Sequence, residues 1–171
     1  AKAAVQRCVS RAEHYIILSF VRQKSRDEKV SIVSPILRDE IEKLKPRKKD
    51  FVLVYLTKKN EKILKVLKQI NEKFVVYGYD KDFEKGNLRF KKAGKNFNQD
   101  LKDAKAVIAT AGFTLISESI FLKKPYFAIP LKGQFEQTLN ALQLREFGIG
   151  EFSEEPTSKE IEKFLESLGK Y

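Results

Sequence analysis

The chain has 171 residues, of which 42% are hydrophobic and 13 are phenylalanine, which excludes a disordered chain and suits one buried core. Its 34 basic and 23 acidic residues give a net charge of +11, which indicates either attraction to an anionic partner or a solvated, ion-paired surface. A single cysteine, Cys8, and a single histidine, His14, exclude an internal disulfide framework and argue against a His/Cys metal site.

The sequence contains no apolar run long enough to span a bilayer, and its first residues lack the pattern of a secretory signal. Together with the single cysteine, this predicts a cytoplasmic protein. The basic charge leaves open a peripheral association with the inner face of the membrane.

Apolar runs alternate with amphipathic stretches along the chain, which predicts strands and helices in turn. Before the basic segment Lys45–Lys49, two strand-like runs cover His14–Phe20 and Lys29–Val33. After it, in chain order, we expect strand Phe51–Leu56, a helix from the N-cap Asn60 to about Glu72, strand Phe74–Tyr77, strand Leu88–Phe90, helix Asn98–Ala104, strand Ala106–Ala109, helix Thr114–Leu122, strand Tyr126–Ile129, a helix from about Phe135 to Phe147, and a last helix, Thr157–Leu168, with Ser158 in its capping region. This alternation predicts an α/β fold, a three-layer, Rossmann-like, doubly wound parallel sheet.

Ligands of such sheets bind at the carboxyl ends of the strands, near the point where the strand order reverses. The segments expected at that edge are Thr57, Tyr77–Tyr79, Thr110–Thr114 and Leu131–Gln137.

Residues 108–141 carry the most informative pattern in the chain. An apolar strand runs into a turn at Ala111-Gly112, an amphipathic helix follows, and a second apolar strand ends at Pro130. The N-terminus of a helix favours an anion, and glycine, which has no Cβ, lets a ligand approach the backbone closely. Spacing alone is also compatible with an ordinary strand-to-helix turn in which Thr114 is the N-cap.

Further residues of this stretch follow in a defined order, namely Gly112, Thr114, Glu118, Lys124-Pro125, Pro130, Glu136-Gln137, Asn140-Ala141 and Gly148. At these residues the chain resembles the C-terminal, donor-binding half of GT-B fold glycosyltransferases, of the type of MurG and of archaeal and bacterial UDP-glucuronosyltransferase-like proteins. The resemblance extends more loosely from about Ser34 to Gly150. One departure is Thr110, which stands where many relatives have a histidine at the strand end.

The resemblance implies an enzyme that transfers a hexosyl group from a nucleotide sugar, with UDP as the nucleotide, to an unknown acceptor without a cofactor. It implies that the turn and first helical residues hold the pyrophosphate, that Glu118 accepts hydrogen bonds from the ribose hydroxyls, and that Phe97-Asn98 lies at the uracil. Glu136, Gln137 and Asn140 would hold the donor sugar. The complete set of expected substrate-binding residues is Thr57, Phe97, Asn98, Thr110, Gly112, Phe113, Thr114, Glu118, Gln134, Glu136, Gln137 and Asn140.

Each of these residues also has an ordinary structural explanation. Glu118 could be a surface glutamate favoured by the helix dipole, and Gln134 or Glu136 could simply cap the start of a helix.

The resemblance also implies a domain organisation. Residues 1–38 would be the tail of an N-terminal acceptor domain together with the crossover Ser34–Arg38, and residues 39–171 would be the donor-binding domain. The catalytic base is expected on the N-terminal domain, because His14 precedes a strand expected to be buried and no other residue qualifies. The chain is therefore expected to be a fragment that is inactive without that domain.

Two other functions fit parts of the sequence. A UDP-sugar epimerase would bind the same donor, but the single histidine counts against it. A nucleic-acid-binding module could use Lys45–Lys49 and Lys81–Lys95, with Phe83, Phe90 and Phe97 stacking on bases. Because these phenylalanines fall where the predicted strands and a helix need core residues, no nucleic-acid partner is expected.

Overall fold

The computed structural model describes residues 12–21, 23–94 and 96–171, and the chain divides into two compact units between Ile36 and Leu37. Cys8 and the other residues of 1–11, which belong to the predicted tail 1–38, lie outside the described residues. The division falls close to the crossover that the sequence analysis placed at Ser34–Arg38, but it does not show what each unit does.

The first unit contains two short strands, β1 (Tyr15–Leu18) and β2 (Val30–Val33), which pair in parallel. The strand β1 was expected to be buried, and this was wrong within the described structure, because Ile16, Ile17 and Leu18 are exposed. A sheet of only two strands cannot cover its own faces. His14 immediately precedes β1, and its Nε2 is 2.8 Å from the Ser31 hydroxyl.

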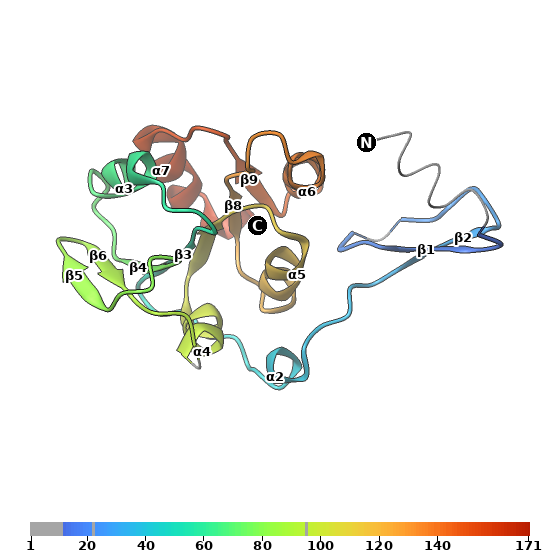
Figure 1. Ribbon diagram of the computed structural model, residues 1–171, viewed down its shortest axis with the longest axis horizontal. Helices are drawn as coiled ribbons and strands as arrows, with labels where there is room; N and C mark the ends of the chain where they lie inside the picture. The colour runs from blue at the N-terminus through green and yellow to red at the C-terminus, as the bar shows by residue number, and fades with distance from the viewer. Residues whose placement is uncertain (1–11, 22, 95) are drawn as a thin grey trace. The chain divides into compact units, whose positions relative to one another are not determined.

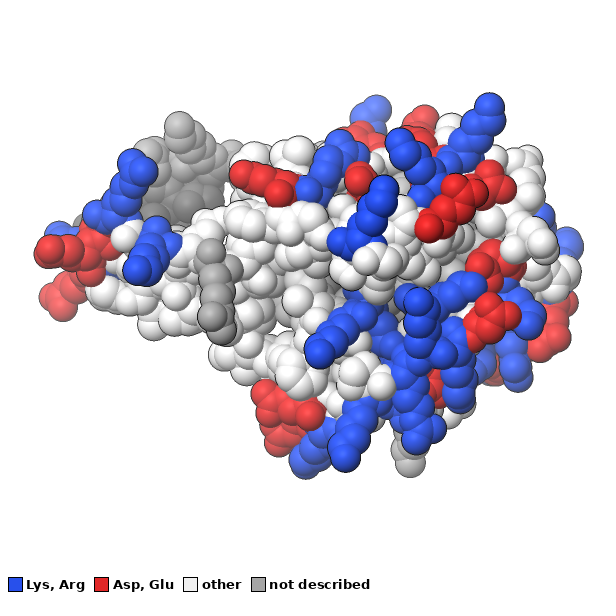
Figure 2. Space-filling view, turned by 180° about the vertical axis from the view of Figure 1, so that it is seen from behind, with Lys and Arg blue, Asp and Glu red and all other residues white. Residues whose placement is uncertain are grey.

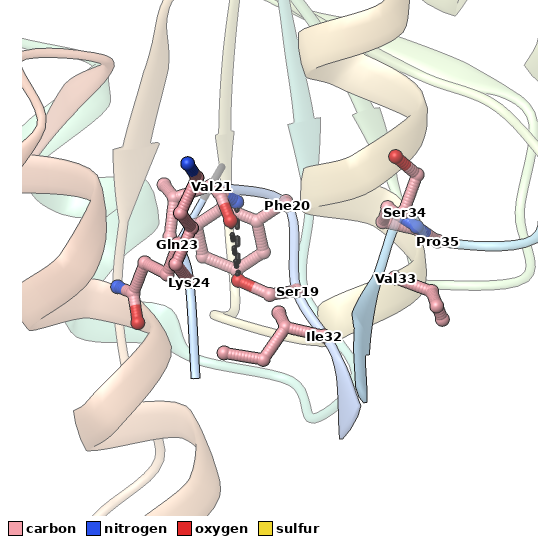
Figure 3. Close-up of a pocket in the computed structure, with 9 residues that line it drawn as sticks. All are labelled: Ser19, Phe20, Val21, Gln23, Lys24, Ile32, Val33, Ser34 and Pro35. Carbon is pink, nitrogen blue, oxygen red and sulfur yellow. Dashed lines mark hydrogen bonds between the residues drawn. The ribbon is translucent and has the colours of Figure 1, made fainter. Parts of the chain in front are cut away.

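A hollow of about 490 Å³ lies within this unit (Figure 3). Ser19 shapes it, because its hydroxyl donates to the Val21 carbonyl at 2.9 Å and accepts from the Val21 N–H at 3.2 Å. None of the predicted donor-binding residues belongs to this unit, since the first of them, Thr57, comes after Leu37.

The second unit is built around a seven-stranded sheet with the order β5-β6-β4-β3-β7-β8-β9. Its strands are β3 (Val52–Tyr55), β4 (Phe74–Tyr77), β5 (Phe83–Lys85), β6 (Leu88–Phe90), β7 (Ala106–Ala109), β8 (Tyr126–Ala128) and β9 (Gly150–Phe152). All neighbours pair in parallel except β5 and β6, which form an antiparallel edge. The central strands are almost fully buried, as expected for parallel strands that helices cover on both faces.

The helices of this unit form a layer on each side of the sheet (Figure 1). They are α2 (Asp39–Glu42), α3 (Glu61–Leu67), α4 (Asn96–Asp103), α5 (Phe113–Phe121), α6 (Phe135–Glu146), α7 (Ser158–Glu166) and the 3-10 turn η1 (Leu168–Lys170). On one side, α3 and α7 lie next to each other, and their buried residues join one core cluster with the strand residues that face them. Right-handed crossovers from β6, β7 and β8 place α4, α5 and α6 on the other side.

This architecture confirms the predicted α/β, doubly wound parallel sheet. The strand β4 has its predicted bounds, and Asn60 caps α3 by accepting from the Ile63 N–H at 3.2 Å. Four short elements of the described structure were not predicted: the edge strands β5 and β9, the helix α2 and the 3-10 turn η1. The last helix is capped by Thr157, one residue before the predicted Ser158, and Glu160 completes a capping box.

Lys124 is a buried lysine that serves the fold at the amino ends of the strands. Its ammonium group donates to the carbonyl oxygens of Ala104, at 2.7 Å, and of Arg47. Burial lowers the pKa of Lys124 to about 8. Because Lys124 lies at the edge opposite the strands' carboxyl ends, we interpret it as a structural residue that links the segments carrying Arg47 and Ala104.

Candidate functional site

The strand order reverses between β3 and β7, which are neighbours in the sheet. The chain leaves β3 towards β4 and β6 and then returns to the other side of β3 as β7. In open α/β sheets, such a point leaves a crevice at the carboxyl ends of the two strands. Thr57 follows β3 at this edge, and the turn Thr110–Gly112 follows β7.

The turn after β7 is held by groups from three other elements. Thr110 donates its N–H to the Tyr55 carbonyl at 3.3 Å, and its own carbonyl accepts from the Tyr126 hydroxyl at 2.7 Å. The Asn140 amide donates to the Ala111 carbonyl at 3.0 Å. The direction in which α5 begins is therefore fixed by β3, β8 and α6.

The N-terminus of α5 opens at this turn. Gly112 is the N-cap and contributes no side-chain acceptor for the N–H groups of the first turn. A Cβ placed on Gly112 would meet no described atom within 4 Å, and its backbone φ of −73° suits any residue. The space in front of Gly112 is open, and the exposed Thr114 stands in the first turn.

Glu118 lies one helical turn beyond Thr114, and its side chain is only 3% exposed. Its two carboxylate oxygens accept from one guanidinium: Arg38 Nε lies 2.6 Å from Oε1, and Nη2 lies 2.9 Å from Oε2. Hydrogen bonding to Glu118 raises the pKa of Arg38. The ordinary explanation of Glu118 as a surface glutamate is therefore wrong.

Arg38 also reaches a third element, because its Nη2 donates to the Asn98 Oδ1 at 3.3 Å. The structure thereby brings Asn98 of α4 and Glu118 of α5 together through one side chain. The sequence analysis placed Arg38 in the crossover and missed it as a site residue. The signal that could have found it is general: a buried carboxylate requires a cation or several donors.

Phe97 packs under the same edge of the sheet. Its ring meets those of Tyr55 and Tyr77 edge-on, with centroids 5.5 and 5.0 Å apart. These two tyrosines are the last residues of β3 and β4, and the Tyr77 hydroxyl donates to Asp100 at 2.6 Å. The Phe97 side chain therefore helps to position α4 at the edge.

The loop between β8 and α6 is closed by Gln137. Its Oε1 accepts from the Leu131 N–H at 3.0 Å, and its Nε2 donates to the Gln134 Oε1 at 2.6 Å. Gln134 is the N-cap of α6 but makes no side-chain capping bond, and Glu136 is exposed. In this structure Gln137 and Asn140 have partners within the chain, and Glu136 faces solvent.

The described residues contain no cluster of His, Cys, Asp and Glu side chains that could hold a metal ion. Among them there is also no helix whose length and apolar character would let it cross a membrane.

Part of the positive charge is paired with acidic side chains near the amino ends of the strands. Figure 2 shows lysine and arginine side chains gathered on one part of the surface, with acidic side chains among them. Near the amino ends of the strands, Asp50 pairs with Lys73 at 3.3 Å and with Lys105 at 3.0 Å. Such pairing is typical of a solvated surface.

Of the aromatic residues considered for base stacking, Phe90 and Phe97 pack inside the unit, whereas Phe83 is exposed on the edge strand β5. Phe83 stacks on Phe90 with a centroid distance of 4.1 Å and an interplanar angle of 4°, while Phe97 packs on the tyrosines described above. Phe90 is buried and Phe97 is half-buried. This arrangement disfavours a nucleic-acid-binding function.

Comparison with known proteins agrees with this fold. The family model described as Glycosyl transferase family 1 matches residues 1–169. No curated protein matches the chain.

Solved glycosyltransferase structures have the same fold. The structure of LpCGTa in complex with UDP has a TM-score of 0.64 at 15% identity and covers 95% of this chain and 47% of its own. MurG of Acinetobacter baumannii has a TM-score of 0.59 at 18% identity, and the match covers 99% of this chain and 55% of MurG. The glycosyltransferase VinC in complex with dTDP has a TM-score of 0.52 at 14% identity, and the match covers 79% of this chain and 37% of VinC. The chain thus spans about half the length of these proteins.

Proposed function

We propose that this chain, which belongs to glycosyl transferase family 1, holds a UDP-sugar donor at the carboxyl edge of its seven-stranded sheet. The observation that carries the proposal is the open N-terminus of α5 at the point where the strand order reverses, with the carboxylate of Glu118 one turn away. A nucleoside diphosphate has the matching chemistry, an anion next to a diol.

Each part of the donor has a proposed place. The diphosphate lies at the N–H groups of the first turn of α5, where the helix dipole favours negative charge. The ribose hydroxyls donate to Glu118, because a carboxylate can accept two O–H groups at once. The base lies towards Phe97-Asn98, and the hexose lies towards the exposed Glu136.

The proposed role in catalysis follows from this placement. When the hexosyl group is transferred, negative charge develops on the departing diphosphate, and the preorganised N-terminus of α5 stabilises it. The acceptor and the base that deprotonates it are proposed to belong to an N-terminal domain, of which β1 and β2 would be the last strands. UDP is the preferred nucleotide, with dTDP next, since one similar structure is a complex with UDP and another with dTDP.

Isothermal calorimetry with UDP, dTDP, GDP and ADP and their glucose conjugates tests the proposal. We expect UDP to bind most tightly and the UDP-sugar to gain from contacts to the hexose. A folded sample that binds none of these ligands at millimolar concentration would overturn the proposal. Arg89→Ala is a suitable control, because Arg89 forms an exposed ion pair with Glu84, at 3.2 Å, and is not one of the proposed binding residues.

A further inference from the structure

Arg38 and Glu118 are separated by 80 positions in the chain yet form a two-pronged ion pair. The Glu118 side chain is 3% exposed, whereas the Arg38 side chain is 50% exposed. The guanidinium therefore lies between a buried carboxylate and solvent. Any hydroxyl group that reaches Glu118 meets a carboxylate whose direction Arg38 already sets.

This geometry leaves Glu118 able to accept more hydrogen bonds. A carboxylate has roughly four lone-pair positions, and the two N–H groups of Arg38 occupy one on each oxygen. Because the two bonds are parallel, they fix the plane of the carboxylate as well as its position. A diol could then use one remaining position on each oxygen without displacing the guanidinium.

The third contact of Arg38 extends this effect to a second helix. Its bond to the Asn98 Oδ1 connects α4 with α5, which carry the residues proposed for the base and for the ribose. An arginine is suited to this role because its planar fork presents several donors in fixed directions, which a lysine ammonium does not.

We propose that Arg38 is a positioning residue of the nucleotide site, which orients Glu118 for the two ribose hydroxyls and fixes Asn98 beside it. This inference rests on the proposed function, because it requires a nucleoside diphosphate at this edge. Arg38 acts through Glu118 and need not touch the nucleotide itself.

The decisive measurement compares two ligands, UDP and 2′,3′-dideoxy-UDP, by calorimetry on the whole chain. For Arg38→Ala we expect the affinity for UDP to fall roughly tenfold, the usual order for losing an oriented, charge-assisted hydrogen bond. The affinity for 2′,3′-dideoxy-UDP should fall clearly less, because that ligand has no hydroxyls for Glu118 to accept from and can lose only the contact of its base near Asn98. Arg38→Lys should recover only part of the loss for UDP.

A double-mutant comparison separates orientation from a structural effect. In the Glu118→Gln background, Arg38→Ala should cause little further loss of UDP affinity, since the group that Arg38 positions has already been changed. Arg38→Ala alone could fail to fold, because Glu118 would be left buried without a partner. In that case the UDP affinities of the double variant and of Arg38→Lys provide the test. Thermal unfolding of each variant monitors the fold.

Four results would overturn the inference. Unchanged binding of UDP by Arg38→Ala would show that Glu118 needs no positioning, and tighter binding would show that Arg38 competes with the ribose. Equal losses for UDP and for the dideoxy ligand would place the effect on the phosphates or on the fold. If the wild-type chain binds no nucleoside diphosphate, the proposed function fails and this inference fails with it.

Discussion

Gly78 and Gly112 lie at the same edge of the sheet but have opposite surroundings. A Cβ on Gly78 would lie 1.9 Å from the Leu56 carbonyl oxygen, and its backbone φ is +101°. At Gly112 the φ is −73° and the space for a Cβ is open. The first glycine is therefore required by the packing of this edge, and the second is not.

Substitution of the two glycines should separate stability from binding. Gly78→Ala should lower the free energy of unfolding by at least about 1–3 kcal/mol, the usual cost of an unfavourable backbone conformation, with the clash in addition. Gly112→Ala should leave that free energy unchanged within about 0.5 kcal/mol but weaken UDP binding, because its methyl group would occupy the approach to the helix N-terminus. Urea unfolding and calorimetry on both variants check this. Wild-type affinity in Gly112→Ala would move the phosphate away from this turn.

A second prediction at the scale of residues distinguishes the ribose from the hexose. Glu118→Gln should keep the fold, since the half-exposed Arg38 can turn to solvent, and should weaken both UDP and UDP-sugar by about 1–3 kcal/mol. Glu136→Ala should weaken only the UDP-sugar, because Glu136 is proposed to touch the hexose alone. Calorimetry of both ligands with both variants gives this pattern. Equal losses of the two ligands in Glu136→Ala would remove that residue from the hexose.

At the scale of elements, α7 is held by a capping box in which Thr157 and Glu160 bond reciprocally. The Glu160 carboxylate accepts from the Thr157 N–H at 2.8 Å, and its pKa lies below the ordinary value chiefly because of this bond. Since the folded-state pKa is lowered, the stabilisation is present above the unfolded-state pKa of about 4.5 and is lost as the pH falls through the folded-state value.

The pH dependence of two variants tests this. At pH 7, Glu160→Gln should be less stable than wild type by about 0.3–1 kcal/mol, and the difference should vanish in acid, where both side chains are neutral. Thr157→Ala should cost about 1 kcal/mol, and part of this cost should persist in acid, because the hydroxyl acceptor does not titrate. Urea unfolding between pH 7 and pH 3 measures both. A difference for Glu160→Gln that grows in acid would contradict the assigned sign.

The elements that were predicted and those that were not differ in length and in the source of their stability. The strands β3, β4 and β7 are continuous apolar runs, so their burial is visible in the local sequence. By contrast, β5 and β9 have three residues each, α2 has four, and β5 is exposed on an outer edge. Pairing with a neighbouring strand forms the two short strands, and no local pattern encodes that pairing.

The predicted site residues between Thr110 and Asn140 were proposed from their order and spacing and from the family resemblance, which a sequence displays directly. Arg38 was missed because its partner Glu118 is 80 positions away and only the fold brings the two together. The proposed contacts of Gly112, Glu118 and Glu136 with a nucleotide sugar stay predictions until a ligand is measured.

At the scale of the whole molecule, the sheet, the core cluster and every proposed site residue belong to the second unit. The first unit contributes a two-stranded sheet with exposed apolar residues such as Ile16 and Ile36, and none of the proposed nucleotide contacts. Folding and nucleotide binding should therefore be properties of the second unit alone.

A chain that lacks residues 1–34 tests this, since it keeps Arg38 and the three residues before it in the sequence, Pro35, Ile36 and Leu37. We expect it to unfold cooperatively and to bind UDP within roughly threefold of the whole chain, which corresponds to less than about 1 kcal/mol. UDP at 100 times its Kd should then raise the free energy of unfolding of both chains by about 2.7 kcal/mol, because only the folded state binds the ligand. Calorimetry and thermal unfolding with and without UDP provide the measurements. If the shortened chain folds but loses UDP binding, the first unit must contribute to the site, and the assignment of the donor site to Leu37–Tyr171 would have to be abandoned.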